Sequence, residues 1–194
     1  MSRHPRGRKA TVRQSPREAE PVTDSISILL DEWRRARPDL DPAPFAIFGR
    51  IWRLSANLSN ESAGWLAPLG LNFESFSLIV TLRRSGPPYE LNPTALYRES
   101  LISSGAITNR IDRVEALGLV KRLPDPEDRR GTIVRLTPKG RKLADKAIEV
   151  HFRRLADCLS ATTAADQARL AALLANLLQS VEGRETPSRM RQKL

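Results

Sequence analysis

The stretch SSGAITNRIDRVEALGLVKRLPDPEDRRGTIVRLTPKG, residues 103–140, decides how the rest of the chain is interpreted. Its first part has apolar residues at helical spacing, with Ser103 placed as the N-cap and Gly118 as the C-terminal stop. Two short runs with alternating apolar residues follow, residues 119–123 and 132–136, around a tip rich in arginine and acids. The stretch therefore predicts a helix followed by a two-stranded hairpin.

Helices are predicted on both sides of this stretch. Their start and stop signals are capping residues, a proline in the first turn and a glycine after the last turn. These signals predict helices from Asp24 past Trp33, from Asp41 to about Trp65, from Asn72 to Gly86, from Pro93 to Glu99, from Thr137 to about Leu159 and from Thr163 to Gly183. A short helix, a turn, a second helix and a hairpin in succession make a winged helix-turn-helix. We expect a mainly α fold with a small β-hairpin wing.

Composition limits the classes of function. Lys and Arg outnumber Asp and Glu by 32 to 22, a formal net charge of +10, which favours polyanionic partners. A single cysteine and two histidines leave too few groups for a disulfide, a zinc site or a serine–histidine triad, so we expect no metal, no cofactor and no enzyme. Neither a membrane-spanning apolar run nor a signal peptide is present, which predicts a cytoplasmic protein without a membrane partner.

The two ends of the chain differ from its middle. Residues 1–22 are rich in arginine and proline, and we expect a disordered basic tail. An alternative is a basic arm that adds sequence-independent affinity for phosphates. Residues 23–183 are predicted to form one domain, and residues 184–194 a flexible C-terminal tail.

The helix over residues 104–117 has one apolar and one polar face. Ile107, Ile111 and Val114, with Leu117 close by, are predicted to face the core. The opposite face carries small, hydrogen-bonding and basic side chains, which suit the major groove of DNA because Asn can pair with adenine and Thr can contact a thymine methyl. An amphipathic helix whose polar face only meets water is the alternative. The expected DNA contacts are Ser103, Ser104, Gly105, Thr108, Asn109, Arg110 and Arg113.

The hairpin tip carries a second set of candidate DNA contacts. Asp128, Arg129 and Arg130 stand at its centre, and a guanidinium there can enter the minor groove, where narrow A·T stretches concentrate negative potential. We expect the Asp128 carboxylate to orient the Arg130 side chain by a charge-assisted hydrogen bond. A loop that is only polar and soluble is the alternative.

Residues 103–140 resemble the MarR family of bacterial transcriptional regulators. The resemblance lies in the recognition helix, in the wing motif Asp128-x-Arg130 and in the exit sequence LTPKG, and it extends over about residues 24–183. It implies a homodimer built from N- and C-terminal helices, here about residues 23–70 and 143–183, with the winged helix-turn-helix at about residues 72–142. Such dimers bind pseudo-palindromic double-stranded DNA. The resemblance also implies a repressor that a small, often anionic or aromatic, effector releases from its operator.

The N-terminal helix and the segment TLRRSGPPY are similar to a branch of the family that responds to urate and small carboxylates. In the urate responders an acidic residue stands where this chain has Ser77, a departure that argues against urate itself. Trp33, Ser77, Arg83 and Arg84 are the expected ligand contacts, because a guanidinium suits a carboxylate. A core aromatic that pins the extra helix is the alternative for Trp33.

The role of Cys158 and the function of the chain as a whole each have alternatives. Cys158 is expected to be a buried, inert thiol rather than a peroxide sensor. The chain as a whole is expected to be a sequence-specific regulator; the alternatives are an architectural, largely non-specific DNA-binding protein and a winged-helix module for protein interaction. A sequence-specific regulator and an architectural protein differ in the ratio of specific to non-specific affinity for DNA, not in affinity alone.

Overall fold

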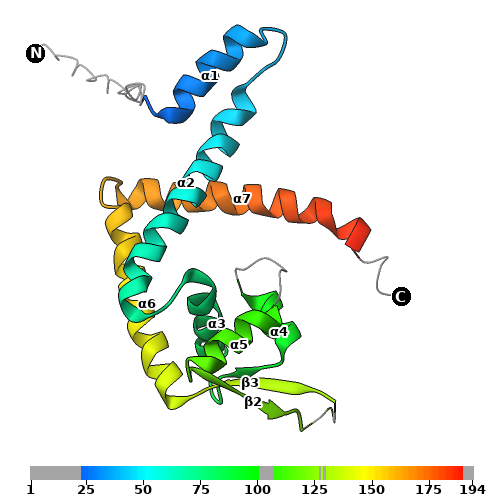
Figure 1. Ribbon diagram of the computed structural model, residues 1–194. Coiled ribbons are helices and arrows are strands. Elements are labelled where there is room, and N and C mark those ends of the chain that lie inside the picture. The colour runs from blue at the N-terminus through cyan, green and yellow to red at the C-terminus, as the bar shows by residue number, and fades with distance from the viewer. Residues whose placement is uncertain (1–22, 101–106, 127, 129, 190–194) are drawn as a thin grey trace, which may run out of the picture. The chain divides into compact units, whose positions relative to one another are not determined.

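The computed structural model describes residues 23–100, 107–126, 128 and 130–189. The chain divides into two compact units, residues 1–56 and 57–194, and the boundary falls inside the second helix. The elements, labelled as in Figure 1, are α1 (Ser25–Ala36), α2 (Ala43–Leu66), η1 (Ala67–Leu69), α3 (Phe73–Arg84), β1 (Glu90–Leu91), α4 (Pro93–Glu99), α5 (Ile107–Ala116), β2 (Val120–Pro124), β3 (Thr132–Leu136), α6 (Pro138–Cys158) and α7 (Ala164–Arg189).

The described part of the first unit contains α1 and the first half of α2. Asp24 caps α1 as predicted, because its carboxylate accepts hydrogen bonds from the backbone N–H groups of Ile26 and Ser27 at 3.1 and 2.8 Å. The same carboxylate accepts a hydrogen bond from the Arg50 guanidinium of α2, with 2.8 Å between Nε and Oδ2. This contact lowers the pKa of Asp24 to about 2. The N-terminal cap of α1 thus also ties α1 to α2.

The second unit contains the winged helix-turn-helix. Its sheet is antiparallel with the order β1-β3-β2, and the β2–β3 hairpin pairs Val120 with Leu136 and Pro124 with Thr132. The predicted hairpin is confirmed, but strand β1 was missed. The sequence shows no local pattern for β1, because this strand has two residues and pairs with residues 134 and 135, far along the chain.

One hydrophobic core joins α3, α5, the sheet and the first half of α6. Ile111 and Val114 of α5 are 1% and 0% exposed, as predicted, and Ile107 packs against the same core. Leu117 is 40% exposed, so its prediction as a core residue is wrong. The helix ends at Ala116, and Leu117 lies in the turn that leads to β2, where it no longer follows the helical face.

The predicted helix start after the hairpin is confirmed in detail. The Thr137 hydroxyl accepts a hydrogen bond from the backbone N–H of Gly140 at 2.9 Å, and Pro138 occupies the first turn. A Cβ atom on Gly140 would lie 1.9 Å from the carbonyl oxygen of Leu119. Only glycine allows the backbone of α6 to approach the turn after α5 so closely.

Two predictions near the C-terminus are wrong. Helix α7 continues past Gly183 to Arg189, which contradicts the predicted stop at Gly183. A glycine inside a helix costs only about 1 kcal/mol relative to alanine, so Gly183 does not by itself end the helix. Cys158, expected to be buried, is exposed. The predicted tail over residues 1–22 and the last residues, 190–194, lie outside the described residues.

No single helix within residues 23–100, 107–126 and 130–189 is long and apolar enough to cross a membrane. The pair formed by residues 43–69 and α3 passes the same test by length and composition, but as a bent pair. Four α3 residues of that pair, Phe76, Leu78, Ile79 and Leu82, are core residues of the second unit.

Candidate nucleic-acid interface

Helix α5 has an exposed polar face, and its opposite face is buried in the core. Thr108, Asn109 and Arg113 are exposed on the side away from the core, and Arg110 is half-buried. Because Ile111 and Val114 are buried on the opposite side, the direction of the exposed side chains is fixed by packing. Three of the predicted DNA contacts that precede α5, namely Ser103, Ser104 and Gly105, lie outside the described residues.

The wing tip is held together by backbone contacts around Asp128. Its carboxylate accepts a hydrogen bond from the backbone N–H of Arg130 at 2.9 Å, and its carbonyl oxygen accepts one from the backbone N–H of Gly131 at 2.8 Å. The Asp128 carboxylate is thus engaged by the main chain of Arg130, and its predicted contact to the Arg130 guanidinium stays a prediction. In turns, an aspartate carboxylate often accepts a hydrogen bond from the backbone N–H group two residues further along the chain. Arg129 lies outside the described residues.

Gly131 allows the tip to close. A Cβ atom there would lie 2.8 Å from the Cβ atom of Asp125 and 3.1 Å from that of Asp128. The carbonyl oxygen of Gly131 also accepts a hydrogen bond from the backbone N–H of Asp125 at 3.2 Å. The acids at the tip therefore shape its backbone, and a side chain at position 131 would force the tip open.

Arg122 connects the wing to α5, a contact that the sequence analysis did not predict. From β2 its guanidinium donates to the carboxylates of Asp112, at 2.5 Å, and Glu115, and its backbone N–H donates to Glu115 at 2.9 Å. Partial burial disfavours the charged guanidinium, but these two carboxylates outweigh burial and raise the pKa of Arg122. The sequence does contain a signal for this contact, because Asp112 and Glu115 precede the turn at residues 117–119 and Arg122 follows it.

Comparison with known proteins agrees with this geometry. A family model described as MarR family matches residues 69–131. The HTH-type transcriptional regulator PecS of Dickeya dadantii (strain 3937) is 32% identical over 149 residues, which are 77% of this chain and 90% of PecS. The chain belongs to the MarR family. PecS is, by its name, a transcriptional regulator with a helix-turn-helix.

Two solved structures have the same fold. A mutant MarR from E. coli complexed with operator DNA superimposes with a TM-score of 0.63 and 25% identity, over 71% of this chain and 96% of that one. The organohalide-sensing regulator RdhR in its 2,4-dichlorophenol-bound form gives a TM-score of 0.67 over 92% of this chain and 94% of that one. At 17% identity the second match shows the fold alone.

In this MarR-family chain the arginines expected to hold a ligand already have partners. Arg83 Nε donates to Asp145 Oδ1 of α6 at 2.6 Å, and the Arg83 guanidinium lies 5.0 Å from the centre of the Tyr89 ring. Arg84 donates to the backbone carbonyl of Glu99 at 2.7 Å. The two neighbouring arginines therefore connect the end of α3 to different elements.

The other two expected ligand contacts lie in different surroundings. Ser77 is 7% exposed and lies in the core-facing part of α3 in the second unit. Trp33 belongs to the first unit and is 50% exposed, so the alternative of a core aromatic is wrong. It lines a pocket of about 280 Å³ together with Arg37, Leu40, Asp41, Pro42 and Phe45.

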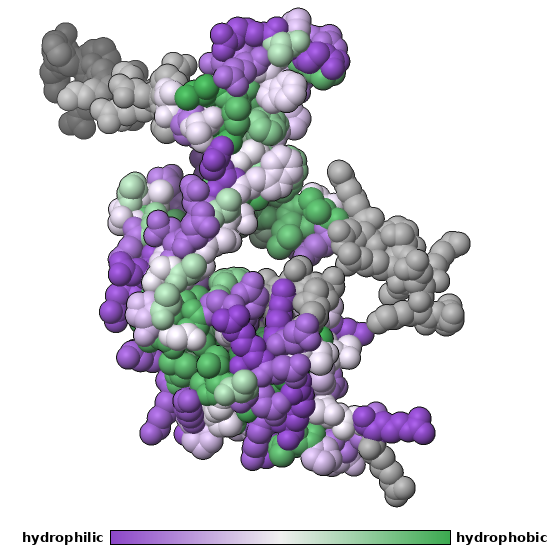
Figure 2. Space-filling model, viewed as in Figure 1, coloured by the Kyte–Doolittle hydropathy of each residue, from purple (hydrophilic) through white to green (hydrophobic). Residues whose placement is uncertain are grey.

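Helix α7 has an apolar surface that the described chain leaves exposed. In Figure 2 hydrophobic side chains gather over α7. Burying such a surface against another chain is a common basis of dimerisation. The exposed apolar residues of α7 are Leu170, Leu173, Leu174, Leu178 and Val181, at 41–58% exposure.

Proposed function

We propose that the chain is a dimeric, sequence-specific repressor that leaves a pseudo-palindromic operator when a small anionic ligand binds. The observation that carries this proposal is the polar face of α5. Thr108, Asn109 and Arg113 point away from a core that buries the other side of the same helix, and the wing lies next to it. This is the arrangement that a recognition helix needs in order to place side chains against base edges.

The residues of α5 have different proposed roles. Asn109 hydrogen-bonds the edge of an adenine, and Thr108 places its methyl group against a thymine. Ser103, Ser104 and Gly105, which precede α5 in the sequence, are proposed as further DNA contacts. Arg110 and Arg113 bind phosphates, which adds affinity but carries no sequence information.

The wing supplies the outer contact. Asp128 and Gly131 fix the backbone of the tip, so Arg130 leaves it from a defined position, and its side chain enters the minor groove with that of Arg129. The support for this role is the backbone contact of Asp128. The acid thus orients the arginine through the main chain.

Dimerisation is proposed to bury the apolar surface of α7 against a second copy. The dimerisation helices would lie within residues 23–70 and 143–183, with the winged domain at residues 72–142 between them. Two copies would then place two recognition helices on half-sites one helical turn apart. The support is the exposure of four leucines and a valine on one helix.

For the effector, the proposal is a small anion held by the guanidinium groups of Arg83 and Arg84 in the second unit. RdhR, which shares this fold, was solved in its 2,4-dichlorophenol-bound form, and this supports a small-molecule effector. A carboxylate that bound Arg83 would compete with Asp145 of α6. Ligand binding would then loosen the contact between α3 and α6, which offers a route from effector to DNA release.

A second candidate function is an architectural DNA-binding protein, which the net charge of +10 favours. A gel-shift titration on the DNA upstream of the protein's own gene distinguishes the two. It is run at physiological salt with excess non-specific competitor, and a panel of small carboxylates and purines is then added. The repressor predicts a complex that survives competitor and dissociates with one compound. Loss of the complex on adding competitor contradicts it and supports the architectural function.

A further inference from the structure

We propose that Arg122 is a positioning residue for DNA recognition: from the wing it neutralises and holds the two carboxylates of α5, Asp112 and Glu115, so that they do not oppose the DNA phosphates. The inference rests on the proposed function, because it concerns how the same interface binds DNA. The role assigned to Arg122 acts through its contacts to Asp112 and Glu115 and not through a contact of its own to DNA.

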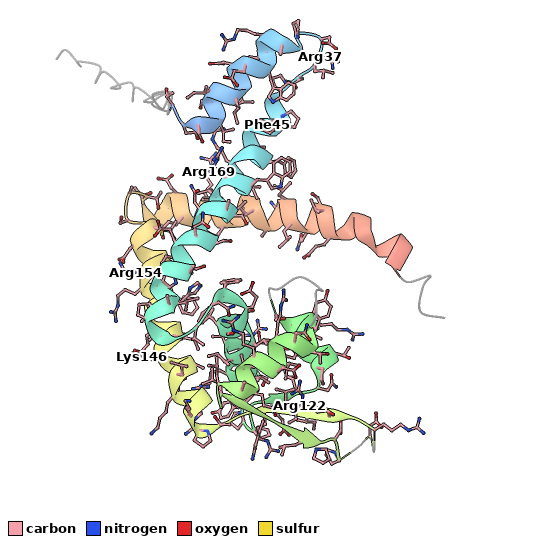
Figure 3. All side chains as sticks on the ribbon, viewed as in Figure 1. Arg37, Phe45, Arg122, Lys146, Arg154 and Arg169 are labelled. Atoms are coloured by element: carbon pink, nitrogen blue, oxygen red, sulfur yellow. The ribbon has the colours of Figure 1, made fainter. Side chains whose placement is uncertain are left out.

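The geometry of the cluster is specific. Arg122, labelled in Figure 3, lies in the hairpin. It reaches Asp112 with one guanidinium nitrogen and Glu115 with another, and these acids are three residues apart on α5. The backbone N–H of Arg122 makes a further hydrogen bond to Glu115 at 2.9 Å. The planar guanidinium can bridge two carboxylates, whereas the ammonium of lysine is a point charge. The cluster therefore fixes the rotation of α5 relative to β2.

The position of Asp112 explains why this neutralisation matters for DNA. Asp112 follows Asn109 by three residues and lies on the same side of the helix. Its side chain is 55% exposed, whereas that of Arg122 is 30% exposed. A free carboxylate beside the recognition surface would repel the phosphates that Arg110 and Arg113 are proposed to bind. With Arg122 in place, this surface has two acids, Asp112 and Glu115, and three arginines, at positions 110, 113 and 122, so its net charge is positive.

Holding the fold together does not require this cluster. Ile111 and Val114 already anchor α5 in the core, and ion pairs that are partly exposed contribute little to stability. The backbone hydrogen bond from residue 122 to Glu115 survives any replacement of the Arg122 side chain except proline. A change at Arg122 is therefore expected to act on DNA binding and to leave the folded dimer intact.

The test uses the full-length protein and the operator fragment found by gel shift, with affinity measured by fluorescence anisotropy. Arg122→Gln is expected to weaken operator binding about tenfold, because both carboxylates become uncompensated. Adding Asp112→Asn and Glu115→Gln to it is expected to restore the affinity to within about threefold, because the repulsion is then gone. Arg153→Gln, the same charge change at an exposed site on α6, is the matched control and leaves the affinity unchanged.

Each outcome decides the inference. Unchanged affinity for Arg122→Gln overturns it, and so does a triple variant that stays as weak as Arg122→Gln, since Arg122 would then contact the phosphates itself. Thermal unfolding and dimer mass are measured for every variant. Should Arg122→Gln fail to fold, Arg122→Lys keeps the charge but not the bridge, and it is expected to keep affinity while losing discrimination against a mutated half-site. Failure of the unaltered protein to prefer the operator contradicts the proposed function instead.

Discussion

Helices α5 and α7 both have an apolar face, but only one of them finds its partner within the described chain. In α5, Ile111 and Val114 are 1% and 0% exposed, whereas in α7 Leu173 and Leu178 are 58% and 57% exposed. The periodicity of a helix shows which side is apolar, but it does not show which chain covers that side. Helix α5 is thus anchored within its own chain, whereas the apolar face of α7 stays exposed in the described chain and is the one proposed to pack against a second copy.

This difference has a thermodynamic consequence. Contacts of α5 contribute to the free energy of unfolding of each chain. Contacts of α7 in a dimer contribute to association, which depends on protein concentration. Mutations in the two helices should therefore be separable by the concentration dependence of their effects.

The largest effect is expected when charges are placed on the apolar face of α7. Leu173→Glu combined with Leu178→Glu should give a monomer and weaken operator binding roughly 100-fold or more, because each carboxylate would have to lose its water in the interface. Sedimentation analysis and gel shift measure both results. Gln179→Glu, at an exposed polar position of α7, is the control. A dimer with normal operator affinity would contradict the assignment of this face.

The next effect contrasts the two helices directly. Ile111→Ala should lower the free energy of unfolding by about 2–5 kcal/mol, whatever the protein concentration, because it leaves a cavity in the core. Leu173→Ala should change the urea midpoint by an amount that depends on concentration. Urea titrations at two protein concentrations make the test. Equal behaviour of the two variants would remove the distinction between the helices.

A smaller change in operator affinity is expected for a mutation in the wing, whose tip is proposed to add DNA contacts to those of α5. Arg130→Ala should weaken operator binding by about 1.5–3 kcal/mol, roughly 10–100-fold, through loss of charge-assisted contacts in the minor groove. Dimer mass and thermal stability should not change, because the backbone contact to Asp128 remains. Arg153→Ala provides the same loss of charge away from the wing. An Arg130→Ala protein with full affinity would refute the role of the wing.

The smallest effect concerns discrimination and not affinity for DNA in general. Asn109→Ala should reduce the preference for the operator over a mutated half-site by about 1–3 kcal/mol. Competition gel shifts with both fragments, at one salt concentration, measure this ratio. Equal weakening on both fragments would mean that Asn109 does not contact bases.

Local signals in the sequence predicted much of this fold. Helix α4 begins and ends at the predicted residues, and Asn72, Thr137 and Thr163 all accept hydrogen bonds from the backbone of the helices that follow them. Each of these features depends on a side chain and a backbone group three residues away. Such contacts are encoded within one turn of chain and need no knowledge of the rest of the structure.

The features that were missed depend on contacts between distant residues or on competing donors. Strand β1 pairs with β3 across most of the winged domain, and Arg122 reaches Asp112 and Glu115 across a turn. Asp128 was predicted to hold a guanidinium, whereas its carboxylate accepts a hydrogen bond from a backbone N–H two residues away. Charge patterns show that a partner exists, whereas the fold decides which of several partners it is.

The contact between Trp65 and His151 gives the protein an internal optical reporter. The indole N–H of Trp65 in α2 donates to His151 Nδ1 of α6 at 3.1 Å, and the Phe76 ring lies 4.6 Å from the imidazole. Burial lowers the pKa of His151, and a protonated Nδ1 no longer accepts this hydrogen bond. The emission of Trp65 should therefore change on mild acidification, while that of the exposed Trp33 and Trp52 stays constant. Fluorescence can thus follow the junction of α2 and α6 without an added dye.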